Sequence, residues 1–314
     1  MLARVLGAAA GGGFPQWNCG CSNCRGVREG TLRARPRTQA ALAVSADLRN
    51  WFLFGASPDV RAQIEGFSAL HPRGARHSPI AGIVLAHGDL DQCLGLLDLR
   101  EGQPLTVYAT DAVRRSFCEG NALYQTLERF PGQVTWRELV PGRAMALTDA
   151  AGRESGLVIE AVPVPGKPPL HRREASREPG NTVGLFVRET ARDRTLAYLP
   201  SVAGPVPALE PLLAGVDVLF FDGTFWSEDE LVRLDPGGPA RPPPPGLRPA
   251  AAMAHWPLGG EGGSLELLGR LPVHRRILIH INNTNPILRE DSPEHGLVQA
   301  AGVEVAWDGM EVLL

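Results

Sequence analysis

Three cysteines crowd into a short segment near the start of the chain, at Cys19, Cys21 and Cys24. Thiolates at this spacing can converge on one ion, because turns reverse the chain tightly enough to point all three sulfurs inward. Zinc sites of the Cys₃His type then need one more ligand from elsewhere in the chain. The alternative is a group of buried or redox-active thiols without metal. We favour the metal and predict a structural zinc, because four protein ligands fill every coordination position.

A second candidate group follows a continuous apolar run, in residues 87–92 (HGDLDQ). In an extended segment His87, Asp89 and Asp91 fall on one side, so an imidazole and two carboxylates face a common point. The alternative role for Asp91 is the N-cap of a helix that begins at Gln92. Capping and catalysis are compatible, and the pattern indicates a candidate catalytic or metal-binding cluster.

One carboxylate and two histidines elsewhere in the chain have the surroundings of a buried site. Asp222 ends an apolar strand, and active sites of sheet proteins gather at such strand ends. An ordinary strand-to-turn aspartate is the alternative. His255 and His280 lie in apolar surroundings next to Gly- or Asn-rich turns, where the alternative is a hydrogen-bonded core histidine. The presence of the other two clusters makes all three residues candidate ligands.

Short apolar runs bounded by turn residues are the elements that must position these side chains. Residues 80–86 (IAGIVLA) are apolar throughout, as expected of a strand buried on both faces. The expected strands span 40–46, 51–55, 80–86, 105–109, 157–164, 182–187, 196–199, 216–221 and 277–281. Helical patterns fall between strands, at 92–100 and 111–129. This order predicts a layered sheet with helices outside.

Length and composition limit the class of fold. The chain has 314 residues, enough for one large domain or two small ones. Its 36 glycines and 28 prolines disfavour a helical bundle, because both residues break helix interiors. A formal net charge of −3 argues against a general nucleic-acid binder. Residues 235–249 (DPGGPARPPPPGLRP) are predicted to form an exposed surface loop of polyproline character.

Cysteine usage and hydropathy bear on the compartment. The chain has five cysteines, and three of them fall within six residues. A secreted disulfide framework usually has an even number of cysteines that are dispersed along the chain. Cys93 and Cys118 are expected to be buried small side chains in helices. The N-terminal apolar run is interrupted at Gly7, so a first strand is favoured over a signal peptide. No apolar stretch approaches the roughly 20 residues of a membrane span, and we expect a cytoplasmic protein.

Motifs spread along the chain resemble those of a known family. Residues 87–92 stand where the metallo-β-lactamase fold carries its His-x-His-x-Asp-His signature. With these residues and the three cysteines, the chain resembles the coenzyme PQQ biosynthesis protein B family over nearly its whole length. The other motifs that carry the resemblance are FFDGTFW (220–226), AHWPLGG (254–260) and IHINNTNPIL (279–288). The resemblance implies an αββα sandwich, two sheets packed face to face with helices outside, as one domain over residues 1–314.

The resemblance also assigns roles to single residues. Active-site positions fall on His87, Asp89, Asp91, Gln92, Asp222 and His255, of which all but Gln92 are expected to bind the active-site metal. His255 is a candidate ligand or proton-transfer residue. His280 is either the last active-site histidine of the fold or the fourth ligand of the cysteine zinc. We favour the zinc, because three cysteines require such a partner and related phosphodiesterases draw a histidine from the same region.

Departures from the signature decide which chemistry the resemblance implies. Asp89 replaces one signature histidine, Gln92 replaces the final one, and Lys167 stands near where a hydrolase often supplies another. Too few histidine ligands therefore remain for a second metal ion. A histidine together with carboxylates and open coordination positions instead suits a single Fe²⁺ that activates O₂. This agrees with the activity proposed for the family, hydroxylation of the tyrosine ring in the cross-linked Glu–Tyr precursor of PQQ.

Two other functions stand as alternatives to the hydroxylase. One is a zinc-dependent hydrolase of the same fold, acting on a phosphodiester or an amide. The other is a non-catalytic carrier of PQQ or its precursor, with only the cysteine zinc bound. The expected partners are O₂ and a small-molecule or peptide-derived Glu–Tyr substrate, with no nucleic acid or membrane and with a homodimer as a candidate assembly.

Overall fold

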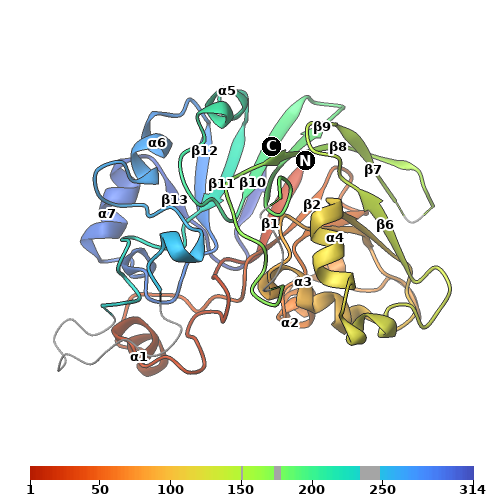
Figure 1. The fold of residues 1–314 in the computed structure, drawn as a ribbon, viewed down its shortest axis with the longest axis horizontal. Coiled ribbons are helices and arrows are strands. Elements are labelled where there is room, and N and C mark those ends of the chain that lie inside the picture. Colours follow the sequence, from red (N-terminus) through yellow and green to blue (C-terminus); the bar gives the residue numbers. More distant parts are fainter. Residues whose placement is uncertain (150, 173–177, 234–247) are drawn as a thin grey trace.

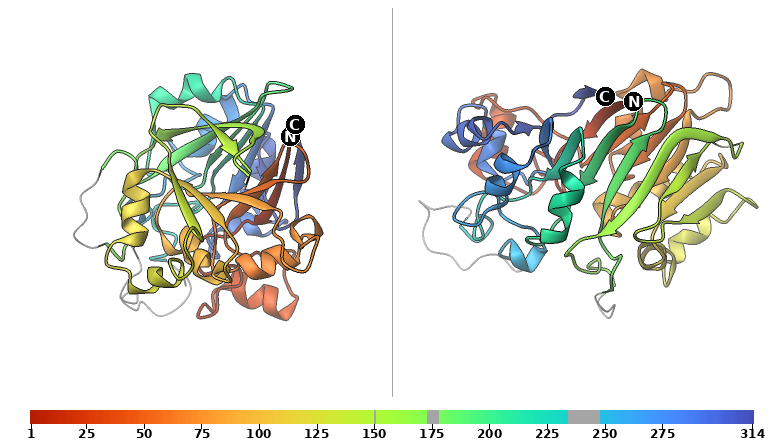
Figure 2. Two further views of the ribbon diagram at one scale, coloured as in Figure 1. Left: turned by 90° about the vertical axis from the view of Figure 1, so that its right-hand side faces the viewer. Right: turned by 90° about the horizontal axis from the view of Figure 1, so that it is seen from above.

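The computed structural model describes residues 1–149, 151–172, 178–233 and 248–314. Within these ranges two seven-stranded sheets pack face to face, and helices cover the outer face of each (Figure 1). The layers are separated when the molecule is viewed from the side and from above (Figure 2). This arrangement confirms the predicted αββα sandwich. The part of the predicted polyproline loop up to residue 247 lies outside the described residues.

The first sheet combines the N-terminal part of the chain with the last strand, in the order β14-β1-β2-β3-β4-β5-β6. Its strands span Leu2–Gly7 (β1), Ala41–Ser45 (β2), Trp51–Phe54 (β3), Ile80–Val84 (β4), Leu105–Ala109 (β5), Val134–Glu138 (β6) and Glu311–Leu313 (β14). Neighbours pair antiparallel from β14 to β3 and parallel from β3 to β6. The carboxyl ends of β3 to β6 therefore share one edge.

The second sheet repeats this plan in the order β13-β12-β11-β10-β9-β8-β7. Its strands span Met145–Thr148 (β7), Glu154–Pro163 (β8), Val183–Glu189 (β9), Arg194–Leu199 (β10), Val218–Asp222 (β11), Arg275–Ile279 (β12) and Glu304–Val305 (β13). Pairing is antiparallel from β7 to β10 and parallel from β10 to β13. A second set of parallel carboxyl ends is thus available for a site.

Seven α-helices are found among the described residues, together with short 3₁₀ segments. The α-helices span Ser22–Glu29 (α1), Val60–Glu65 (α2), Leu90–Cys93 (α3), Asp111–Cys118 (α4), Glu210–Leu213 (α5), Ser264–Arg270 (α6) and Pro293–Ala300 (α7). The 3₁₀ segments include Leu94–Leu99 (η2), Ala122–Thr126 (η3) and Pro286–Leu288 (η6). Apolar residues of α2 and α4 pack on the first sheet, and those of α5, α6 and α7 pack on the second. No helix in the described part of the chain is long and apolar enough to cross a membrane.

Strand β11 shows why the apolar runs in the sequence are continuous. Val218 and Phe220 point into the core between the two sheets, whereas Leu219 and Phe221 pack beneath the helices of the outer layer. A strand covered on both faces needs apolar side chains at every position. Asp222 ends this run with a fully buried carboxylate, which must find polar partners where the strand ends.

The predicted strands are confirmed, but both predicted helices are shorter than expected. The pattern at 92–100 divides into α3 and the 3₁₀ segment η2, and the pattern at 111–129 into α4 and η3. The second division falls at Gly120, whose φ of 68° lies in the left-handed region and cannot continue an α-helix. Strands β6, β7, β13 and β14 were not expected, because they are short and lie at or beside the sheet edges.

Candidate metal centres

Three parallel strands from the two sheets end at the same edge of the sandwich. The segment after β4 carries His87, Asp89 and Asp91, the end of β11 carries Asp222, and the residue after β12 is His280. We call these side chains, together with His255, the Asp/His cluster. Ligand sites of open sheets form at the carboxyl ends of parallel strands, and the fold brings the predicted residues together there.

Asp222 and His255 form a buried pair. Nδ1 of His255 donates to Oδ2 of Asp222 at 2.7 Å, and the backbone N–H of Val202 donates to the same oxygen at 2.9 Å. Oδ1 of Asp222 accepts from the backbone N–H of Thr224 at 2.9 Å and from its hydroxyl at 2.6 Å. This pair places Nδ1 of His255, and not Nε2, beside the carboxylate, so a cation held by both side chains would replace the proton between them.

His280 is held in place by strained backbone and by two polar partners. Its φ of 59° is unusual for a residue with a side chain, and such strain costs about 1 to 3 kcal/mol. Nδ1 lies 2.8 Å from the Thr224 hydroxyl, and Nε2 lies 2.9 Å from Oδ2 of Asp91. Because the single Thr224 hydroxyl proton is directed to Asp222, Nδ1 of His280 is the donor to Thr224. Nε2 then faces the Asp91 carboxylate with either a proton or a metal ion between them.

His87 is buried, with 3% of its surface exposed, and neither ring nitrogen makes a hydrogen bond. Its Nδ1 lies 3.4 Å from Oδ2 of Asp89, within ion-pair range, and its ring centroid lies 6.4 Å from that of His280. Nε2 is therefore a buried nitrogen without a partner, which is costly unless an ion satisfies it, whereas Nδ1 has only the long contact with Asp89. The turn between His87 and Asp89 requires glycine, because a Cβ on Gly88 would lie 2.1 Å from the Ser116 hydroxyl.

Opposite effects act on the pKa values of the buried acids. Burial alone would raise the pKa of Asp91 and Asp222, but the hydrogen bonds and positive charge of His280 and His255 lower it overall. The pKa of Asp89 is likewise lowered against burial, chiefly by His87 and with a smaller contribution from Lys167. For His280, the Asp91 carboxylate outweighs burial and raises the pKa. These carboxylates are therefore ionised and ready to bind a cation.

The donor set of the Asp/His cluster fits a divalent metal ion. One ligand atom each from Asp222, His255 and His280 can be chosen so that all lie within 4.8 Å of one another. Two histidines and one carboxylate with open positions are the donor set typical of non-heme Fe²⁺ sites. A bound cation would give the buried ring nitrogens of His87, which make no hydrogen bond, a partner. It would also bind between Nε2 of His280 and the Asp91 carboxylate.

Two other sequence candidates take different places. Gln92 is fully buried, and its Nε2 donates to the Ala40 carbonyl of the first sheet at 3.0 Å. This hydrogen bond holds the side chain against the first sheet and leaves its Oε1 buried without a hydrogen-bond partner, so the role of Gln92 at the active site stays a prediction. Nζ of Lys167 donates to the Met253 carbonyl at 2.8 Å and contributes positive charge near Asp89.

The three cysteines form a second cluster, at the start of α1. Cys19, Cys21 and Cys24 have sulfurs within 4.8 Å of one another, and the Cys21 Sγ accepts from the Cys24 backbone N–H at the N-cap of the helix. A hydrogen bond from the Cys21 thiol lowers the pKa of the Cys19 thiol to about 5. The same hydrogen bond, together with burial, raises the pKa of the Cys21 thiol. Their convergence suits a tetrahedral zinc. Cys93 is buried and Cys118 half-buried, both away from this group.

The structure corrects the assignment of His280. Its ring lies in the Asp/His cluster, stacked 5.2 Å from His255, and does not approach the cysteines. The side chain that reaches the cysteines from the same loop is Asn283, whose Nδ2 lies 3.1 Å from the Cys19 Sγ and 3.3 Å from the Cys24 Sγ. The left-handed backbone at His280 turns these two side chains to different clusters, which sequence spacing alone does not indicate.

Sequence reasoning missed two residues at these centres, Thr224 and Asn283. The Thr224 hydroxyl is within hydrogen-bond distance of Asp222, His255 and His280, so one side chain touches three candidate ligands. Its position two residues after Asp222, in the apolar DGTFW run, was the available signal. Asn283 lies among several asparagines of the INNTN run, and no pattern distinguishes it from its neighbours.

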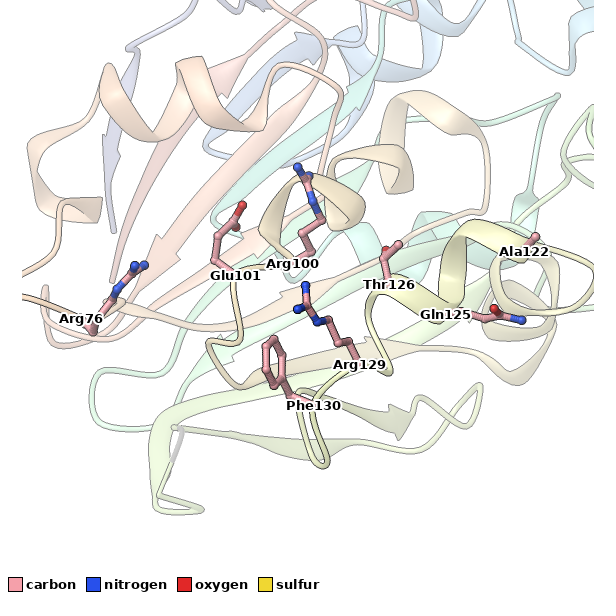
Figure 3. Close-up of a pocket in the computed structure, with 8 residues that line it drawn as sticks. All are labelled: Arg76, Arg100, Glu101, Ala122, Gln125, Thr126, Arg129 and Phe130. Carbon is pink, nitrogen blue, oxygen red and sulfur yellow. The ribbon is translucent and has the colours of Figure 1, made fainter.

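A separate surface groove lies outside the first sheet, near η2 and η3 (Figure 3). Its lining includes Arg76, Arg100, Arg129 and Phe130, with the Arg129 guanidinium 5.3 Å from the Phe130 ring centroid. None of its lining residues belongs to the Asp/His cluster or to the cysteine cluster. The groove is therefore distinct from both candidate metal centres.

Comparison with known proteins gives matches over the whole chain. Residues 50–281 match the model of the beta-lactamase superfamily domain. Coenzyme PQQ synthesis protein B of Ectopseudomonas mendocina is 44% identical over 100% of both chains, and that of Azotobacter vinelandii is 42% identical over 99% of both. The crystal structure of zinc-bound PqqB from Methylobacterium extorquens superposes with a TM-score of 0.89 at 39% identity, over 100% of both chains.

Proposed function

The chain belongs to the coenzyme PQQ synthesis protein B family, within the beta-lactamase superfamily, and we propose that it serves PQQ biosynthesis as an iron-dependent hydroxylase that uses O₂. Its proposed substrate is the tyrosine ring of the cross-linked Glu–Tyr precursor. The observation that carries the proposal is the donor set Asp222, His255 and His280, two histidines and one carboxylate gathered at one sheet edge.

The proposed metal ligands divide into two groups by position. Asp222, His255 and His280 come from the second sheet and its loops, and His87, Asp89 and Asp91 come from the first. When bound, Fe²⁺ would supply the electron transfer to O₂ that the protein's own side chains cannot provide. Oxygen and nitrogen donors with a surplus of negative charge suit this ion, whereas thiolates favour zinc.

Several residues of the chain prepare the site for this reaction. Thr224 fixes which ring nitrogen of His280 faces the metal, and Asp91 lies 2.9 Å from that nitrogen. His87, Asp222, His255 and His280 are each at most 8% exposed, so bulk water is excluded from the ligand atoms. Leu90 is half-exposed between the two carboxylates of the β4 exit and offers apolar surface to an aromatic ring.

The proposed step inserts one oxygen atom into an aromatic C–H bond of the phenol. One atom of O₂ becomes the new hydroxyl group, and the other leaves as water with two protons. The two electrons that balance the step come from an external two-electron reductant. Every turnover therefore consumes one O₂ and one equivalent of reductant for each hydroxyl group added.

Reconstitution with iron tests the proposal. The full-length protein is loaded anaerobically with Fe²⁺, and O₂ consumption is followed with a tyrosine-like phenol and ascorbate as the reductant. We expect O₂ uptake that depends on the phenol, matches the hydroxylated product in amount and is lost in the Asp222→Asn variant. Substrate binding without any turnover would instead establish the carrier alternative.

A zinc-dependent hydrolase is the second candidate function, favoured by the zinc-bound state of the Methylobacterium extorquens relative. In that case the same carboxylates and histidines would hold zinc and activate a water molecule. Full hydrolytic turnover of a phosphodiester or amide by iron-free, zinc-loaded protein would support this function and overturn the hydroxylase.

A further inference from the structure

The side-chain amide of Asn283 lies over the three cysteine sulfurs. Its terminal atom is 3.1 Å from the Cys19 Sγ, 3.3 Å from the Cys24 Sγ and 3.8 Å from the Cys21 Sγ. The residue is 3% exposed, so this position is shielded from water. The three sulfurs at the start of α1 and the side-chain amide of Asn283, from the loop after β12, therefore surround one point.

The dimensions of this group match a zinc tetrahedron. With Zn–S distances of about 2.3 Å and a Zn–O distance of about 2.0 Å, a sulfur and an oxygen ligand of one tetrahedral zinc lie roughly 3.5 Å apart. The three distances from the Asn283 amide to the sulfurs lie on both sides of this value. No other His, Asp, Glu or Cys side chain among the described residues joins the cysteines within metal-ligand range.

The loop that carries Asn283 is fastened to the cysteine helix. Nδ2 of Asn23, in α1, donates to the backbone carbonyl of Asn283 at 3.2 Å and to that of Asn285 at 3.0 Å. Asn23 itself is buried. The amide is thus held over the sulfurs by contacts that do not involve its own side chain, as expected of a preorganised ligand.

We propose that Asn283 is the fourth protein ligand of the cysteine zinc, bound through its side-chain oxygen. Turning the amide about its last bond exchanges Nδ2 and Oδ1 and places the oxygen over the sulfurs without any other movement. A Cys₃Asn set leaves no open position, so the site is structural. The proposal is independent of the reaction at the Asp/His cluster.

The competing role for Asn283 is an N–H donor that stabilises the thiolates without touching the metal, and substitution by aspartate separates the two roles. Asn283→Asp keeps an oxygen ligand but removes the donor, whereas Asn283→Leu removes both. We expect Asn283→Leu to lower zinc affinity at the cysteine site at least 10-fold and Asn283→Asp to keep it within about threefold of wild type. Asn18→Leu, an exposed change next to Cys19, is the matched control and should leave the affinity unchanged.

The measurement uses the full-length protein loaded with Co²⁺ and then titrated with Zn²⁺. Thiolate-to-cobalt charge-transfer absorption reports only metal bound by cysteine, so the Asp/His cluster does not contribute. X-ray absorption at the zinc edge is recorded when one equivalent of Zn²⁺ has replaced the thiolate-bound Co²⁺ and Co²⁺ still occupies the Asp/His cluster; it should show three sulfurs, one oxygen or nitrogen and no imidazole scattering. Unchanged affinity in Asn283→Leu, loss of zinc in Asn283→Asp, or imidazole scattering in the wild type would each overturn the assignment. If Asn283→Leu does not fold, the aspartate variant and the absorption spectrum still decide.

Discussion

Two clusters of metal-ligand side chains lie on either side of the loop after β12. His280 belongs to the Asp/His cluster, and three residues further on Asn283 contacts the cysteine cluster. The three cysteines of the cysteine cluster all come from six consecutive residues, 19–24, at the start of α1. The Asp/His cluster instead collects single side chains from the exits of β4, β11 and β12 and from the segment that carries His255.

The difference in assembly corresponds to a difference in task. Sulfur donors that enclose a metal with no open position stabilise the fold, whereas mixed nitrogen and oxygen donors with open positions can bind reactants. Of the four non-glycine residues with left-handed backbone in the described part of the chain, His280 lies in the Asp/His cluster, Ala254 lies next to His255, and none is a residue of the cysteine cluster. Removal of the cysteine metal should therefore affect stability, and removal of the other metal should affect reactivity.

The largest expected effect is on the cysteine side. Cys21→Ser should abolish zinc binding by this cluster and lower the free energy of unfolding by several kcal/mol, since structural zinc contributes folding energy directly. Zinc content and the thermal midpoint are measured together, and we expect the midpoint to fall by about 10 °C. Cys118→Ser, a half-buried cysteine outside the cluster, is the control. An unchanged midpoint in protein that has lost this zinc would contradict a structural role.

The opposite pattern is expected for the Asp/His cluster. Asp91→Asn should weaken binding of the second metal about 100-fold or more, because it removes a charge from the site, while the thermal midpoint falls less than in Cys21→Ser, by the loss of the ion pair with His280. Metal affinity is measured by competition with a chelator of known affinity. Asp98→Asn, an exposed change in η2, serves as the control. An Asp91→Asn variant that binds both metals as tightly as the wild type but melts far below it would contradict the division between the two clusters.

Thr224 should show a smaller effect on the same site. Thr224→Val keeps the shape of the side chain but removes the hydroxyl that touches Asp222, His255 and His280. We expect metal affinity at the Asp/His cluster to fall roughly 10-fold, and Thr224→Ser to restore most of it. Equal affinity in the valine and serine variants would show that the hydroxyl does not position the ligands.

Glu230, in the loop after β11, tests the electrostatics between the clusters. Burial raises its pKa from 4.5 to about 7, and its hydrogen-bond partners, which include Thr284, Asn282 and the Trp226 backbone N–H, carry no charge. The folded state therefore binds more protons than the unfolded state between pH 4.5 and 7, and this group makes stability fall as the pH rises through that window. Glu230→Gln should remove a fall in the free energy of unfolding of about 2 to 3 kcal/mol between pH 4.5 and pH 7, measured by urea unfolding at these two pH values. A wild-type-minus-variant difference that is the same at both pH values would contradict this account.

The sequence could predict those features of the two clusters that come from residues close together in the chain. The cysteine trio and the residue types of HGDLDQ lie close together in the chain, so their chemistry could be predicted without knowing the fold. Continuous apolar runs such as 80–86 predicted buried strands, because both faces of each central strand are covered. The family resemblance supplied the order of the layers.

The rest depends on geometry that spacing does not encode. His280 was assigned to the wrong cluster because its direction is set by a left-handed backbone at the end of β12. Gln92 was assigned from the last position of the family signature, and spacing did not indicate that its Nε2 donates to the Ala40 carbonyl. Asn283 and Thr224 carry polar groups that usually serve turns and caps, so residue type gave no reason to select them.

Oxygen-isotope labelling tests the central claim, that the Asp/His cluster is an oxygen-activating iron site, most directly. The Fe²⁺-loaded protein is supplied with a tyrosine-like phenol, ascorbate and ¹⁸O₂ in unlabelled water, and the product is analysed by mass spectrometry. We predict one ¹⁸O atom for each hydroxyl group added to the ring and no product from the Asp91→Asn variant. A hydroxylated product whose new oxygen comes only from water, or the absence of any hydroxylated product from Fe²⁺-loaded protein that binds the phenol, would contradict the account.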